Sequence, residues 1–174
     1  MTTDPTVVAE PPRRRAKHRL LQSLVALSMV VGAVGTTAGT ASAAQTCTGA
    51  TDANLCLWID GVGNGNFRVH VGIDVHISRA DAQEYIDDAG DPFTVWIRGN
   101  DNGPNEFLFS LPMTAIGASD ESGLSGDFEL VVPATSLNED SGTDEIVAVV
   151  TLTDTDTNTV TKNFVSNQLV GNWP

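Results

Sequence analysis

Residues 66–77, NFRVHVGIDVHI, alternate apolar and polar side chains over their whole length. One parity is apolar and holds Phe67, Val69, Val71, Ile73, Val75 and Ile77. The other parity holds Arg68, His70, Gly72, Asp74 and His76. Successive side chains of a β-strand point to opposite faces, whereas a helix would spread the same residues around its circumference. The pattern therefore predicts one long strand. A charged residue in place of Val71, on the apolar parity, should be severely destabilising, whereas a charged residue in place of His70, on the polar parity, should change stability little.

Shorter segments with β patterning follow along the chain. Strands are predicted at 56–60, 93–99, 107–111, 126–132, 145–153 and 159–166. Turn-forming residues at 60–66 and 154–158 are typical of connections between antiparallel neighbours. Both faces of 145–153 are apolar, which indicates a central strand, and Val160 and Phe164 are predicted core residues of the strand after it.

Three polar segments are predicted to be irregular. Residues 44–55 lack alternation, 113–126 are mostly small and polar, and 134–143 have Leu137 as their one large apolar anchor. At the end of the chain, Trp173 is expected to pack back onto the body of the domain.

One helix is predicted between two strands, at residues 78–89. Ser78 followed by Asp81 resembles a capping box, and Ala82, Tyr85 and Ile86 could share one face. Gly90 and Pro92 then stop the helix. We expect it to cover an open end or edge of the sheet.

About seven short strands with one inserted helix fit an antiparallel β-sandwich of immunoglobulin-like or C2-like architecture. The predicted domain spans residues 44–174. Cys47 and Cys56 are too close in sequence for the bridge that joins the two sheets of antibody domains, so any kinship is one of architecture.

The first 43 residues have the organisation of a secretory signal peptide. Five of the nine basic residues fall within 13–19, an apolar run of about fifteen residues follows, and Ala41, Ser42 and Ala43 form an A-x-A site. Cleavage is expected after Ala43, or alternatively after Ala44. An uncleaved anchor is the other possibility, but about twenty apolar residues are needed to span a bilayer. We therefore expect a protein secreted to the cell envelope or beyond it.

The mature chain is strongly acidic. The whole chain has a formal charge of −13, and residues 1–43 contain five of its nine basic but only two of its twenty-two acidic residues. Four basic and twenty acidic residues remain, which gives a charge near −16. Such a surface repels nucleic acid and anionic lipid, so the expected partner is an extracellular ligand or envelope component, with no stable membrane anchor after cleavage.

Cys47 and Cys56 are the only cysteines, and in an exported protein they are predicted to form a disulfide. Their bridge would close a loop of about ten residues and stabilise the fold by roughly 2–3 kcal/mol.

Calcium is the one cofactor that the sequence brings into consideration. Asp154, Asp156 and Asn158 place oxygen side chains at alternate positions of a predicted turn. Thr159 and Val165 stand where an EF-hand loop has glycine and glutamate. An ordinary acidic turn is the alternative, because Asp and Asn favour turns for backbone reasons.

Four side chains are candidates for surface contacts: Trp96, His70, Asp74 and His76. His70 and His76 are six positions apart, about 20 Å along a strand, so one metal ion cannot bind both. With Trp58 and Tyr85, Trp96 could contribute to an aromatic surface for sugar, although packing beneath the helix is the favoured interpretation.

No residue is predicted to be catalytic, since neither G-x-S-x-G nor H-E-x-x-H occurs. The favoured function is a non-catalytic binding or structural module. A small hydrolase with a glycosidase-like carboxylate pair is the rival, and a deep cleft around two acids would favour it.

Overall fold

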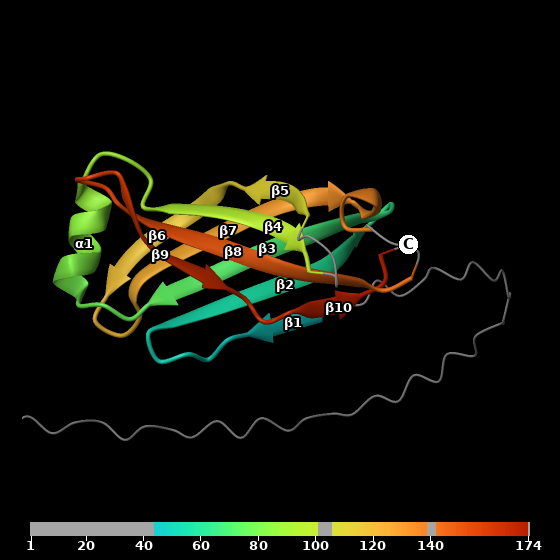
Figure 1. Cartoon of the computed structure of the whole chain (residues 1–174), viewed down its shortest axis with the longest axis horizontal. Coiled ribbons are helices and arrows are strands. Elements are labelled where there is room, and N and C mark those ends of the chain that lie inside the picture. Colours follow the sequence, from blue (N-terminus) through green and yellow to red (C-terminus); the bar gives the residue numbers. More distant parts are fainter. Residues whose placement is uncertain (1–43, 101–105, 139–141, 174) are drawn as a thin grey trace, which may run out of the picture. The chain divides into compact units, whose positions relative to one another are not determined.

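Ten β-strands, one α-helix and one short 3-10 helix form the part of the chain that the computed structural model describes, residues 44–100, 106–138 and 142–173. The predicted signal peptide lies outside these residues. All strand pairs are antiparallel, and they form two sheets (Figure 1). The mainly-β, antiparallel character predicted from the alternation is confirmed.

The first sheet has the order β1-β2-β3-β7-β6. Its strands are β1 (Ala44–Cys47), β2 (Ala53–Gly63), β3 (Asn66–Val75), β7 (Gly123–Pro133) and β6 (Met113–Ser119). The long strand predicted at residues 66–77 is β3, the central strand of this sheet, and it ends two residues before the predicted boundary. Asn64 and Gly65, with φ of 54° and 71°, form the two-residue turn between β2 and β3.

The second sheet is built on β8 (Asp144–Asp154). On one side β8 pairs with β4 (Phe93–Gly99), which pairs with β5 (Phe107–Leu111). On its other side lie two short strands end to end, β10 (Leu169–Gly171) and β9 (Thr159–Val165). β8 therefore has partners along both of its edges, and the predicted central position is confirmed.

Most of the buried side chains of the two sheets belong to one hydrophobic core. Val69 and Val71 of β3, Ile97 of β4 and Val150 of β8 are all fully buried. Pro112 separates β5 from β6, so the chain crosses from the second sheet to the first at that residue.

The helix α1 (Arg79–Asp87) follows β3 and packs on β6 and β7, at one end of the strands (Figure 1). Asp81 N donates to Ser78 Oγ at 3.1 Å, which is the predicted N-cap. Ala82 is fully buried, and Tyr85 and Ile86 pack against the core. Two predictions are therefore confirmed: that these three residues share one face of the helix, and that the helix covers an open end or edge of the sheet.

Two of the segments predicted to be irregular contain strands. Residues 113–126 form β6 and the start of β7, and within 44–55 lie β1 and the first residues of β2. Both β1 and β6 are edge strands of the first sheet. Hydrogen bonds to a neighbouring strand hold an edge strand in place, so it needs no strict apolar alternation.

Among the individual core residues, Leu137 and Trp173 are buried as predicted, and the Trp173 ring packs edge-on against Phe67 with centroids 5.4 Å apart. The prediction for Val160 is wrong, since it is 55% exposed, whereas Phe164 is 9% exposed. Lys162 lies between these two positions on the same parity and reaches Asp52. The core therefore does not extend to this end of β9.

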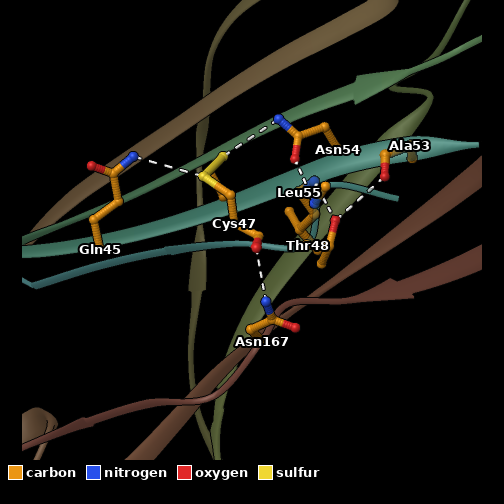
Figure 2. The surroundings of a disulfide bond; sticks show 9 residues. Gln45, Cys47, Thr48, Ala53, Asn54, Leu55 and Asn167 are labelled. Atoms are coloured by element: carbon orange, nitrogen blue, oxygen red, sulfur yellow. Dashed lines mark hydrogen bonds between the residues drawn. A yellow bond between two sulfur atoms is a disulfide. The ribbon is translucent and has the colours of Figure 1, made fainter. Parts of the chain in front are cut away.

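The predicted disulfide is present and joins Cys47 to Cys56 within the first sheet, where the two residues are directly paired neighbours on β1 and β2. Figure 2 shows Asn167, from the segment between β9 and β10, donating from Nδ2 to the Cys47 carbonyl at 2.7 Å. Lys162 and Asp52 form a second link between the two sheets, and this hydrogen bond holds the pKa of Asp52 below its usual value.

Candidate functional site

The side of the first sheet that faces away from the core is rich in polar side chains, and we call it the outer face of the first sheet. Strands β2, β3 and β7 contribute to it in aligned cross-strand rows. The rows are Asn54–Asp74–Ser125, Cys56–Gly72–Asp127, Trp58–His70–Glu129 and Asp60–Arg68–Val131. Three neighbouring strands thus supply groups to one surface.

Gly72 lies in the middle of this face and has no side chain to fill the space between its neighbours. A Cβ at this position would lie 3.3 Å from Trp58 Cζ3 and 3.5 Å from Asp127 Oδ1. The gap is part of a depression of about 150 Å³, which we call the Gly72 depression. Its lining consists of Asn54, Cys56, Trp58, Gly72, Ile73, Asp74, Ser125, Gly126 and Asp127.

Trp58 separates this hollow from a second one. The other depression, of about 290 Å³, is lined by Trp58, Asp60, Arg68, His70 and Glu129. The Trp58 and His70 rings meet edge to face with centroids 4.9 Å apart. An aromatic ridge therefore stands between two hollows, each of which has charged side chains in its lining.

The charges of this face are mainly negative. The guanidinium group of Arg68 lies 3.3 Å from Glu129 Oε1 and 3.8 Å from Asp60 Oδ2. His70 Nε2 is 3.2 Å from Asp127 Oδ1, and Ser125 donates to Asp74 Oδ1 at 2.6 Å. The Gly72 depression therefore holds two carboxylates and has no Lys or Arg in its lining.

The disulfide lies at the margin of the same depression, because Cys56 is part of its lining. Asn54 Nδ2 approaches Cys56 Sγ at 3.7 Å, and Asn54 Oδ1 accepts from Gly49 N at 3.0 Å (Figure 2). The bridge and these contacts fix the position of Asn54 at the rim.

The four predicted contact residues do not form one surface. His70 and Asp74 lie on the outer face of the first sheet, but His76 lies beyond the end of β3, with Nδ1 2.8 Å from the Thr51 carbonyl. Trp96 belongs to the second sheet. The expectation that Trp96 packs beneath the helix is wrong, because it is 40% exposed and its ring lies 6.2 Å from that of Phe107.

The predicted calcium ligands lie at the β8–β9 hairpin, where Asp154 and Asp156 share a depression of about 130 Å³ with Glu84 and Asp88 of the α1 region. Asp154 Oδ1 already accepts from Thr157 N at 3.0 Å, which is a turn-stabilising hydrogen bond. Asn158 has a φ of 52°, as turn residues often do. Among the described residues, no group of three or more His, Cys, Asp or Glu is arranged to hold a metal ion.

We expect calcium and magnesium to raise the melting temperature of the protein equally, because both ions would only screen the repulsion between these carboxylates. Asp156→Asn should itself stabilise slightly, by a few tenths of a kcal/mol, since it removes one of the repelling charges. Thermal melting in calcium, magnesium and sodium chloride of matched ionic strength checks both expectations. A larger shift with calcium that Asp156→Asn abolishes would instead demonstrate a specific site.

The cross-strand rows of the outer face contain a hydroxyl group, that of Ser125, and an imidazole, that of His70. The Ser125 hydroxyl donates to Asp74, and the ring nitrogens of His70 lie 3.2 Å from Asp127 Oδ1 and 3.5 Å from Glu129 Oε2. In the residues the structure describes, Ser125 therefore has no histidine to act as its base. For Trp58, the alternative to a binding role is a structural one, since an aromatic ring can cover a glycine in a neighbouring strand.

Sequence reasoning missed Ser125, Asp127 and Glu129. Ser125 falls in the segment predicted to be a loop, and the partners of β3 across the sheet were unknown. Gly72 was the available signal, because it is the one residue without a side chain on the polar parity of an otherwise regular strand. No protein-family model, curated protein or solved structure matches this chain.

Proposed function

We propose that this protein is a secreted, non-catalytic binding module of antiparallel β-sandwich architecture, and that it binds its ligand on the outer face of the first sheet. The observation that carries the proposal is the Gly72 depression, in which a missing side chain leaves a hollow between groups from three strands. An immunoglobulin-like or C2-like arrangement is part of the proposal. Its support is the single core that both sheets share.

The rigidity of the surroundings supports this assignment. The depression is floored by β3, the central strand, and Trp58 is partly buried at its wall. Sites on regular strands hold their groups more accurately than sites on loops. A partly buried tryptophan beside fixed hydrogen-bonding groups is a common anchor in binding surfaces.

A hydrolase is the less favoured function. Asp74 and Asp127 are diagonal neighbours on β3 and β7, and such residues are roughly 7–8 Å apart, near the spacing of an inverting glycosidase pair. The hollow between them has a volume of only about 150 Å³. Pockets that enclose small molecules have volumes of about 300–1,000 Å³, so this one is too small to surround a sugar ring and exclude water.

Gly72→Ser tests the binding face, because the added side chain enters the depression and requires only a small shift of Trp58. We expect it to weaken binding at least tenfold while the melting temperature changes little. Two-dimensional NMR titration of the mature protein with a tetra-arginine peptide, a chitosan tetramer and cellotetraose provides the measurement. Gly117→Ser is the matched control, since a Cβ there meets nothing within 4 Å.

If none of the three probes shifts the amides of β2, β3 and β7, or if Gly72→Ser binds as well as wild type, the proposed binding face is wrong.

Secretion is proposed from the sequence of residues 1–43, together with the Cys47–Cys56 bridge, which indicates an oxidising compartment. We expect the exported protein to begin at Ala44 or Gln45, and intact mass spectrometry of the culture medium and cell envelope would measure this. An uncut chain retained in the membrane would contradict the proposal. Among the described residues, none of the helices is both long and apolar enough to cross a bilayer.

A further inference from the structure

We infer that the ligand is a basic polypeptide, and that the Gly72 depression receives the guanidinium group of one of its arginine side chains. This inference rests on the proposed binding face and names the chemistry of its ligand. It follows from the charges around the depression, from its size and from the position of Trp58.

The first argument is charge complementarity. Asp74 and Asp127 line the depression, and the basic side chains of the domain are engaged elsewhere. Arg68 pairs with Asp60 and Glu129, Arg79 with Asp120, and Lys162 with Asp52, while Arg98 lies on the second sheet. Within residues 44–100, 106–138 and 142–173, no Lys or Arg is therefore paired with these two carboxylates. A cationic ligand would complement them and would be attracted by the acidic surface around them.

The second argument is the availability of carboxylate oxygens. Asp74 receives a hydrogen bond from Ser125 on Oδ1, and His70 lies against Oδ1 of Asp127. The Oδ2 atoms of both residues have no partner among the described residues, and the Asp127 side chain is 53% exposed. Two such oxygens from adjacent strands can accept N–H groups from one planar donor. Arginine carries five N–H groups in a rigid fork and satisfies this arrangement better than a single ammonium group.

The third argument concerns size and the indole ring. At about 150 Å³ the depression admits the head of a side chain rather than a sugar ring. Trp58 Cζ3 and Cη2 would lie 3.3 and 3.6 Å from a Cβ at residue 72, so the ring borders the space above the glycine. A guanidinium group there would combine ion pairing with a cation–π contact, the preferred partner of which is tryptophan. An amino sugar would bring a similar charge but would have to place its ring in the same small space.

The decisive comparison uses two peptides of nearly the same shape, of which only one carries the positive charge and the full set of guanidinium N–H donors. Acetylated tetra-arginine amide and the corresponding tetra-citrulline peptide, in which each guanidinium is replaced by a neutral urea, are titrated into the mature protein by isothermal calorimetry at 0.15 M ionic strength. We expect the arginine peptide to bind at least tenfold more tightly. Asp127→Asn and Asp74→Asn should each weaken its binding fivefold or more, and Trp58→Ala should do the same.

Matched variants separate a specific site from general attraction to an acidic protein. Asp156→Asn removes the same charge at the β8–β9 hairpin, and Trp96→Ala removes an exposed indole from the second sheet. Both should change the affinity for the arginine peptide by less than twofold. Equal losses from Asp127→Asn and Asp156→Asn would overturn the inference, because they would show that only net charge matters.

The ligand class and the binding face can fail separately. If cellotetraose or the chitosan tetramer binds at β2, β3 and β7 and Gly72→Ser weakens that binding, while tetra-arginine does not bind better than tetra-citrulline, the face is correct and the basic polypeptide is wrong. If tetra-arginine binds but Gly72→Ser has no effect on its affinity, both the inference and the proposed face are wrong. Melting curves of every variant verify that the fold is retained.

Discussion

Val71→Asp is expected to cost more than about 4 kcal/mol and to leave much of the protein unfolded at room temperature. Val71 is fully buried on the central strand β3, directly between Leu57 of β2 and Phe128 of β7. A carboxylate there would lie in the core without a partner, which is among the most damaging single changes. Because small domains are stable by only about 5–15 kcal/mol, the loss is a large fraction of the total. Urea unfolding monitored by circular dichroism measures it.

Val131→Asp is the appropriate control, because it makes the same chemical change at a residue that is 49% exposed on the neighbouring strand and pairs with Arg68. We expect it to change stability by no more than about 0.5 kcal/mol. His70→Asp, which the sequence alone offers as the control, is unsuitable, since it would place a third carboxylate beside Asp127 and Glu129. Comparable losses from the Val71 and Val131 variants would mean that both faces of the first sheet are buried.

Gly123→Ala should be nearly as damaging, with an expected loss above about 3 kcal/mol. Gly123 begins β7 with a φ of +73°, and a Cβ there would lie 2.2 Å from the Val75 carbonyl oxygen and 2.8 Å from the backbone N and O of Ile77. All three are backbone atoms, so no side-chain rotation can relieve the contact. The chain leaving β3 would have to move, and this adds to the cost of the left-handed backbone conformation. Thermal and urea unfolding of the variant give the magnitude.

Gly65→Ala separates those two costs. Gly65 has a φ of +71°, close to that of Gly123, but a Cβ at this position would meet nothing within 4 Å. It should therefore show only the conformational penalty, roughly 1–2 kcal/mol. If the Gly65 and Gly123 variants lose the same free energy, the close approach between β7 and the end of β3 is not the cause.

Several features of the fold could be predicted because their causes are local. The period-2 alternation of residues 66–77 determines which side of β3 is buried, whatever its neighbours are. Ser78 and Asp81 determine the start of α1 through one hydrogen bond between residues three apart. The two apolar faces of β8 indicated its central position. Cys47 and Cys56, as the only cysteines, had one possible pairing.

The candidate site could be predicted only in part. His70 and Asp74 are on the polar parity of the predicted strand, and Trp58 was recognised as a candidate aromatic contact. Ser125 and Asp127 join them only because β7 pairs with β3 in one particular register, some fifty residues away along the chain. A shift of that register by one residue would turn both side chains to the other face of the sheet.

Tertiary structure alone decided the edge strands and the hollow. β1 and β6 are held by backbone hydrogen bonds to β2 and β7, and such bonds leave no apolar alternation in the sequence of an edge strand. In the sequence, Gly72 is visible only as a missing side chain on the polar parity of a strand, and it produces a depression because Trp58 and Asp127 border it from two other strands. Side-chain periodicity is a local property of the chain, whereas strand pairing depends on contacts between distant residues, and the candidate binding surface is formed by the pairing.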